Sequence, residues 1–194
     1  PWVAIEKLAA RRHLGLPEAG RVWLAFGHLR DGKQLDVVLE ALAQAPASDH
    51  LCVAGREQSG GQRPASYYRE LAARLGVADR VSWHIGYIPD DQVALFFVAS
   101  DVLMLTYSSA FRSASGVLNV NGPFGLPVVA SGGEGPLKNA VRRYHLGHWL
   151  DAATPQSVTA ALADGFPVPN WAAYVADHSW ETNAARLWHT LRTA

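Results

Sequence analysis

Short runs of apolar residues alternate along the chain with segments in which apolar residues recur at three- and four-residue intervals. A short apolar run predicts a buried strand, and the wider spacing predicts a helix with one buried face. The segments that predict strands are 22–26, 51–54, 81–88, 101–107, 127–130 and 148–150. Those that predict helices are about 32–45, 68–75, 89–97, 115–124, 136–144, 155–163 and 171–193.

This alternation predicts an α/β fold, because helices between consecutive strands favour a parallel sheet. We expect a doubly wound, Rossmann-like sheet of about six strands, with helices on both faces and a helical C-terminal tail. A length of 194 residues suits a single domain. We divide it into a lead-in (1–19), a β/α core (20–150) and the tail (151–194), whose Trp171, Trp180 and Trp188 are expected to be packing anchors.

Composition narrows the class of protein. Hydrophobic residues make up 49% and charged residues 18%, and the formal net charge is zero, which argues against a nucleic-acid surface or a polybasic membrane surface. The chain shows no signal peptide and no apolar run of the ~18 residues that a membrane span needs. The single cysteine, Cys52, lies in an apolar run, where a buried strand residue is favoured over a reactive nucleophile. The chain begins at Pro1 without a methionine, so we expect it to be part of a longer protein.

The loop after the first predicted strand is the first candidate binding site. Doubly wound sheets bind ligands outside the carboxyl ends of their strands. Here that loop carries Gly27, His28, Arg30 and Lys33. The glycine permits close approach of a ligand to the backbone, and the three basic side chains are candidate donors to phosphate. The alternative is a solvated loop with Lys33 on the surface of the following helix.

The segment 113–131 is the second candidate, because Ser-Ala-Ser-Gly at 113–116 opens a short predicted helix. The exposed N–H groups at such a helix start favour phosphate, and a second helix start follows the glycine-rich loop 132–135. An ordinary connection with glycine and proline at its breaks remains the alternative. Neither a P-loop nor a G-x-G-x-x-G pattern is present, and the histidines lack the spacing of zinc ligands.

Five motifs in sequence order resemble the C-terminal lobe of a GT-B glycosyltransferase. The resemblance is to the retaining, nucleotide-sugar-dependent family 4-like (group 1) enzymes, and it covers about residues 20–150. The motifs are F-G-H-L-R-D-G-K at 26–33, L-C-V-A-G at 51–55, V-S-W-H-I-G-Y-I-P-D-D-Q-V at 81–93, A-S-D-V-L-M-L-T-Y at 99–107 and G-P-F-G-L-P-V-V-A-S at 122–131.

The resemblance implies a donor-binding lobe in which a G-R-L-x-x-x-K-G loop holds the diphosphate. Lys33 matches the lysine of that loop, whereas His28 replaces the arginine, and Arg30 is a candidate to supply the missing charge. Where the family often carries two glutamates, this chain has Arg112 and Val120, with Asn119 and Asn121 as partial substitutes. The implied donor-binding residues are Gly27, His28, Arg30, Lys33, Tyr87, Ile88, Arg112, Ser113, Ser115, Gly116, Val117, Asn119 and Val120.

The resemblance therefore implies a glycosyltransferase lobe that uses a nucleoside-diphosphate sugar, with UDP or GDP as the nucleotide, and a glycan or lipid-linked acceptor. Lys33 and Arg30 would stabilise the leaving group, no metal or further cofactor is required, and a separate N-terminal lobe would bind the acceptor. We expect a bacterial, cytoplasmic enzyme of polysaccharide synthesis, peripheral to the inner membrane when complete, and inactive as this segment alone. The alternatives are a non-catalytic nucleotide or sugar-phosphate binding module and, less favoured, an epimerase relative on the same fold.

Overall fold

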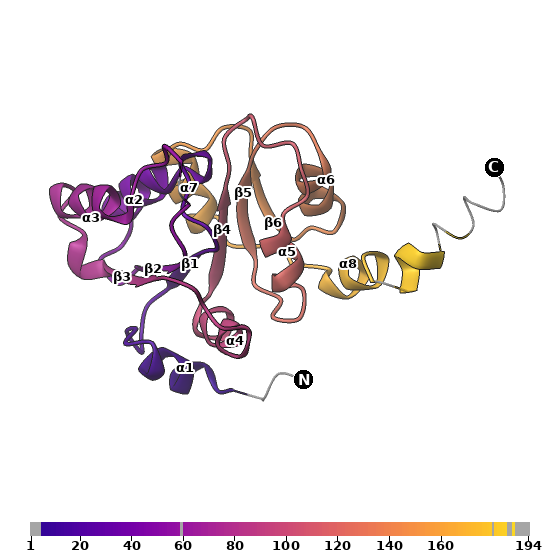
Figure 1. Cartoon of the computed structure of the whole chain (residues 1–194), viewed down its shortest axis with the longest axis horizontal. Coiled ribbons are helices and arrows are strands. Elements are labelled where there is room, and N and C mark those ends of the chain that lie inside the picture. Colours follow the sequence, from indigo (N-terminus) through magenta and orange to yellow (C-terminus); the bar gives the residue numbers. More distant parts are fainter. Residues whose placement is uncertain (1–4, 59, 180, 186–187, 189–194) are drawn as a thin grey trace.

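The computed structural model describes residues 5–58, 60–179, 181–185 and 188. A six-stranded parallel sheet forms its centre, in the order β3-β2-β1-β4-β5-β6 (Figure 1). The strands are β1 (Val22–Phe26), β2 (His50–Gly55), β3 (Val81–Ile85), β4 (Val102–Thr106), β5 (Val128–Ser131) and β6 (Gly147–Leu150). The helices are α1 (Lys7–His13), α2 (Leu35–Gln44), α3 (Ala65–Arg74), α4 (Asp90–Ala99), α5 (Gly116–Asn121), α6 (Pro136–Arg143), α7 (Pro155–Ala163) and α8 (Trp171–Asp177).

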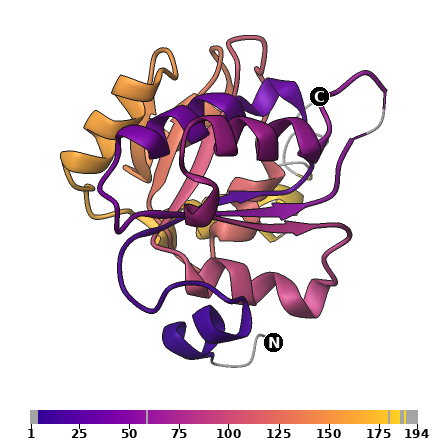
Figure 2. The same cartoon turned by 90° about the vertical axis from the view of Figure 1, so that its left-hand side faces the viewer.

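Two hydrophobic cores lie on opposite faces of the sheet, because successive side chains of a strand point to opposite faces. In β1, Leu24 belongs to the core shared with α4, α5, α6 and α8, whereas Trp23 belongs to the core shared with α2, α3 and α7. Figure 2 shows helices above and below β1–β3. The predicted doubly wound α/β fold is confirmed.

The strand order places a topological switch point between β1 and β4. From β1 the chain builds outward through β2 to β3, returns to β4 on the other side of β1, and builds outward again to β6. Neighbouring loops diverge at such a point and leave a crevice at the carboxyl ends of the strands. The loops after β1 and β4 border that crevice.

Four element boundaries differ from the predictions by three residues. The helix expected over 68–75 covers Ala65–Arg74. The strand expected to reach residue 88 ends at Ile85, because Gly86 turns away with φ +149° and donates its N–H to the Gly55 carbonyl oxygen at 3.0 Å. The helix expected from residue 32 begins at Leu35, after a 3-10 turn (Asp31–Lys33) and a left-handed Gln34. The helix expected over 115–124 covers Gly116–Asn121.

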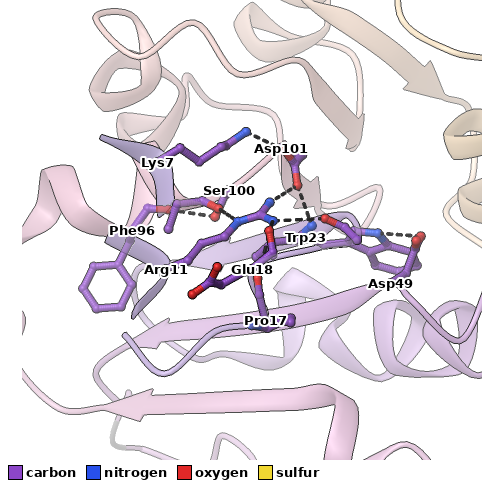
Figure 3. A network of polar contacts seen from close by, with 12 residues as sticks. Lys7, Arg11, Pro17, Glu18, Trp23, Asp49, Phe96, Ser100 and Asp101 are labelled. Atoms are coloured by element: carbon purple, nitrogen blue, oxygen red, sulfur yellow. Dashed lines mark hydrogen bonds and ion pairs between the residues drawn. The ribbon is translucent and has the colours of Figure 1, made fainter. Parts of the chain in front are cut away.

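The N-terminal helix α1 is joined to the amino-terminal edge of the sheet through a buried arginine (Figure 3). Arg11 is 4% exposed, and its guanidinium donates to the backbone oxygens of Ala99, Pro17, Glu18 and Gly20. It also donates to the Asp101 carboxylate at 2.6 Å. These contacts lie at the amino-terminal ends of the strands, away from the crevice at their carboxyl ends.

The C-terminal tail packs against both faces of the sheet. Helix α7 belongs to the core that contains α2, and Trp171 of α8 is buried in the other core, as expected of a packing anchor. Trp188 is 64% exposed, so the same expectation is wrong for that residue. Trp180 lies outside the described residues, and of the helix expected over 171–193 the structure describes Trp171–Asp177 and a second helical stretch at 181–185.

Candidate functional site

The loop after β1 is bonded to the carboxyl end of β4. Ser108 donates its N–H to the Gly32 carbonyl oxygen at 2.9 Å, and the Thr106 hydroxyl donates to the Lys33 carbonyl oxygen at 3.0 Å. The 3-10 turn that carries Lys33 is therefore held across the switch point by its backbone.

The Lys33 side chain turns back under the loop, toward the end of β1. Its ammonium donates to the Phe26 carbonyl oxygen at 2.5 Å, and a Cβ on Gly27 would lie 3.0 Å from Lys33 Nζ and 3.4 Å from a methyl group of Val117. Burial, and after it the positive charge of Arg30, lowers the pKa of the Lys33 ammonium to about 8. The alternative of a solvated lysine on a helix surface is wrong, and Gly27, Lys33 and Val117 meet at one point.

Beside this point, a pocket of about 320 Å³ opens over the carboxyl ends of β1, β2 and β3. Its walls come from the β1, β2 and β3 loops, the first turn of α4, and α5. It includes five of the predicted donor-binding residues, although they are far apart in sequence. The lining residues are Phe26, Gly27, His28, Gly55, Arg56, Gly86, Tyr87, Ile88, Asp90, Val93 and Val120.

Two charged residues of this pocket, Arg56 and Asp90, were not singled out from the sequence. Each follows closely on a strand, Arg56 directly after β2 and Asp90 at the first position of α4. The rule that ligands bind at the carboxyl ends of strands does select both loops. It does not say which of several polar residues in a loop turns inward, so the fold was needed to find them.

Arg30 lies apart from this pocket. Its guanidinium carbon is 6.0 Å from the centre of the Phe111 ring, a cation–π arrangement. It lines a separate hollow of about 180 Å³ with Gly32, Tyr107, Ser108 and Phe111. The three basic residues of the β1 loop, His28, Arg30 and Lys33, share one small cavity of about 30 Å³. Of the three, His28 alone lines the larger pocket, and Arg30 alone lines the separate hollow.

The start of α5 is built largely by internal contacts. Ser115 is buried and caps the helix by accepting the Leu118 N–H, and its hydroxyl also hydrogen-bonds the Tyr107 hydroxyl at 3.1 Å. Ser113 and Gly116 are exposed. The helix starts within one residue of its predicted position. Of the two serines, Ser113 is open to solvent, whereas Ser115 is used as a helix cap.

The glycine-rich loop at 132–135 packs against Arg112 and its neighbours. Gly133 donates its N–H to the Phe111 carbonyl oxygen at 2.9 Å, and a Cβ on Gly135 would lie 2.5 Å from the Arg112 carbonyl oxygen. Because glycine has no Cβ, the loop at 132–135 can pack directly against the backbone at 111–112. These contacts give the glycines a packing role, and the expectation that the loop belongs to a phosphate site stays a prediction.

The two asparagines considered as substitutes for glutamate are bonded elsewhere. The Asn119 side-chain oxygen accepts from the Tyr174 hydroxyl of α8. Asn121 is fully buried, and its amide bonds the backbone N–H and carbonyl oxygen of Leu126. Asn121 therefore shapes the turn before β5, and the expectation that it replaces a sugar-binding glutamate is wrong.

Three further features bear on metal binding, membrane spanning and thiol chemistry. The described part of the chain contains no group of three or more histidine, cysteine, aspartate and glutamate side chains placed to hold a metal ion. None of the helices described has the length and apolarity that a membrane span requires. Cys52 is buried, and burial raises the pKa of its thiol to about 12, so it has no thiolate character at neutral pH.

Comparison with protein families gives one match, to the model described as "Glycosyl transferases group 1", over residues 6–165. Among curated proteins, the chain is 32% identical to a D-inositol 3-phosphate glycosyltransferase of Thermobispora bispora, covering 93% of the chain and 45% of the relative. It is 30% identical to the protein of the same name from Mycolicibacterium vanbaalenii, covering 89% of the chain and 36% of the relative. The chain thus spans less than half the length of these relatives.

Solved structures show the same fold at lower identity. The Anabaena protein Alr3699/HepE in complex with UDP-glucose superposes with a TM-score of 0.79 at 18% identity, covering 97% of this chain and 52% of that one. The lipopolysaccharide glycosyltransferase WaaG superposes with a TM-score of 0.69 at 23% identity, covering 88% and 46%. In both, a chain of this size corresponds to about half of the larger protein.

Proposed function

This chain belongs to the group 1 glycosyl transferases, and from that premise we propose that it is the lobe that binds the nucleoside-diphosphate sugar donor. The observation that carries the proposal is the Lys33 ammonium, which is held at the carboxyl end of β1 beside a pocket lined by Gly27. A partly buried ammonium next to an open pocket gains most from a strongly anionic ligand, because burial has already removed much of its hydration. A diphosphate meets that requirement.

The pocket suits the nucleoside part of such a donor. Tyr87, which is 74% exposed, and Ile88 form one end, and Val120 of α5 forms part of the wall. An exposed aromatic ring at the mouth of a pocket is suited to stacking on a nucleobase. We place the base at Tyr87 and Ile88 and the diphosphate toward Gly27 and Lys33. The UDP bound by the Anabaena protein supports a nucleotide in a lobe of this fold.

Sugar transfer would then depend on stabilising the departing nucleoside diphosphate. Its negative charge grows as the bond to the sugar breaks, and a fixed ammonium favours that change. Lys33 is the cation that we assign to this role, and Arg30, whose positive charge also acts on Lys33, adds to the positive field from the neighbouring hollow. We also propose that the exposed residues at the start of α5, Ser113 and Gly116, face the donor. A retaining outcome, implied by the family resemblance, is part of this proposal.

The rest of the enzyme would supply the acceptor site. The chain covers 36–45% of its first curated relatives, which leaves room for a second lobe of similar size. We propose that this lobe binds a glycan or lipid-linked acceptor, and that residues 1–194 alone bind donor without transferring sugar.

A calorimetric titration of the chain with UDP, GDP and their glucose esters tests the donor site. We expect one of the nucleotides to bind, and Lys33→Ala to weaken it at least ~10-fold, since a charge-assisted contact to phosphate is lost. Lys138→Ala is the matched control, because Lys138 lies on α6, outside the pocket, and pairs with Glu134 of the preceding loop. If neither nucleotide binds at millimolar concentration, the proposal fails.

A second candidate is a nucleotide-binding module that does not catalyse transfer. The observation that favours it is Val120, an apolar side chain in the pocket wall where the family often carries a glutamate. Transfer and donor-hydrolysis assays of the protein extended by its second lobe separate the two. Nucleotide binding without any turnover would favour the module.

A further inference from the structure

The loops after β1 and β2 run side by side beyond the ends of their strands. Leu29 donates its N–H to the Arg56 carbonyl oxygen at 2.9 Å, and Gln58 donates to the Leu29 carbonyl oxygen at 3.1 Å. Leu29 and Glu57 thereby form an isolated parallel bridge. Since paired positions in parallel strands share a face, this extension brings the preceding residues, His28 and Arg56, next to each other.

The side chains of His28 and Arg56 meet at the pocket. The Arg56 guanidinium donates to His28 Nε2 at 3.3 Å, and both residues are exposed while lining the pocket with Gly27 and Tyr87. Because the ring nitrogen that accepts this bond carries no negative charge, the positive charge of the Arg56 guanidinium is not neutralised by it. Four of its N–H groups remain for a ligand.

Arg56 is also the one arginine or lysine among the described residues that line this pocket, and Asp90 is the one carboxylate. Lys33 lies below, under Gly27, and Arg30 lines the other hollow, against Phe111. A dianionic group entering between Gly27 and Tyr87 therefore meets Arg56 from the pocket wall and Lys33 from beneath. No arginine of the β1 loop has that position.

Building on the proposed function, we propose that Arg56 is a phosphate-binding residue of the donor site. Its guanidinium binds a phosphate of the nucleoside diphosphate from the β2 side, in the space that an arginine at position 28 would otherwise reach. His28 orients Arg56 through the hydrogen bond between them. The forked, permanently charged guanidinium suits two oxygens of one phosphate.

The test compares ligands that carry the phosphates, the nucleoside, or both. Wild type is first titrated with UDP and GDP, and the tighter nucleotide is then used with its nucleoside and with inorganic pyrophosphate. Arg56→Ala is expected to weaken nucleotide and pyrophosphate ~10-fold or more and nucleoside less than ~2-fold, followed by calorimetry or ligand-observed NMR. Arg74→Ala, an equal loss of charge at an exposed site in the last turn of α3, should change none of them.

A rescue variant distinguishes a phosphate contact from a structural role. His28→Arg combined with Arg56→Ala restores a guanidinium within reach of the same space, so nucleotide affinity should recover to within ~3-fold of wild type. Equal loss of nucleoside and nucleotide affinity in Arg56→Ala, or unchanged nucleotide affinity, would overturn the assignment. If wild type binds neither nucleotide nor pyrophosphate, the proposed function fails, and this inference fails with it.

Discussion

At the scale of single residues, Lys33 is a basic side chain held where burial disfavours its charge. Its ammonium has the Phe26 carbonyl oxygen as a partner and a neighbouring positive charge on Arg30, and burial is the main reason that its pKa falls to about 8. In the free protein the charged form is thus disfavoured relative to water. An anionic ligand reverses this balance, which is why we expect binding to be accompanied by proton uptake near pH 8.

The same residue should make stability depend on pH in a defined direction. The folded pKa of about 8 lies below the ordinary value of 10.5, so below pH 8 both states hold the proton and folding carries the full cost of burying the charge. Between pH 8 and 10.5 the unfolded state binds more protons, and the free energy of unfolding rises with pH. Lys33→Met should therefore be more stable than wild type at pH 7 by roughly 1–3 kcal/mol.

Urea unfolding at pH 7 and at pH 10 measures this effect. The advantage of Lys33→Met should shrink at the higher pH, because wild type gains stability there and the variant does not. A stability difference that is the same at both pH values would show that the ammonium is not disfavoured in the fold. The same variant should lose nucleotide affinity, so stability and binding change in opposite directions.

At the scale of elements, the ends of the strands and helices were harder to predict than their existence. Six strands and seven helices lie near the predicted positions. Apolar runs and helical spacing of apolar residues can be recognised within a short segment of sequence. The boundaries at Ile85 and Leu35 depend on Gly86 bonding Gly55 and on a left-handed Gln34. Those are contacts and conformations that the loops adopt only after the strands have assembled.

The contact between the β1 and β2 loops makes one glycine irreplaceable at this scale. A Cβ on Gly55 would lie 2.1 Å from the Gly27 carbonyl oxygen, and Gly55 has φ +140°. Gly55→Ala must force the loops apart, and we expect a loss of about 3 kcal/mol or more in the free energy of unfolding. Gly116→Ala is the control, because that site is helical and a Cβ there meets nothing within 4 Å.

Denaturant unfolding of the two variants tests whether the loss comes from the close contact at Gly55 or from any replacement of glycine by alanine. Gly116→Ala should unfold within about 1 kcal/mol of wild type, since alanine is the better helix former. Comparable losses in both variants would contradict the contact seen at Gly55.

At the scale of the whole molecule, the two ends of the parallel strands differ. The pocket and Lys33 lie at the carboxyl ends, whereas Arg11 and Asp101 join α1 to the amino-terminal ends (Figure 3). Asp101 also accepts from Lys7 and from the N–H of Val22 at the start of β1. The helix that precedes the sheet is therefore a fixed part of this fold.

Removing this buried arginine should be far more costly than removing its neighbour. Arg11→Met removes a buried donor from four backbone oxygens and from Asp101, which keeps its bonds to Lys7 and to the Val22 N–H, and we expect a loss of about 3–5 kcal/mol in the free energy of unfolding. Arg12→Met breaks an exposed ion pair with Glu18, which water and salt screen, and should change the free energy of unfolding little. Thermal or urea unfolding of both variants measures the difference, and similar losses would contradict a structural clamp at Arg11.

The sequence by itself determined the fold class, the strands, the helices α2–α8 and the family, because periodicity and motif order are local properties of the chain. It also marked the loop that carries Lys33. It did not predict α1 (Lys7–His13), which lies in the segment expected to be a lead-in. Only the tertiary structure showed that this lysine turns under Gly27, that Arg30 and Arg56 lie on different sides of the site, and that the glycines at 132–135 and the amide of Asn121 are used in packing. The physical reason is that the direction of a loop side chain depends on which neighbouring loops it meets, and those neighbours are brought together only when the sheet has formed.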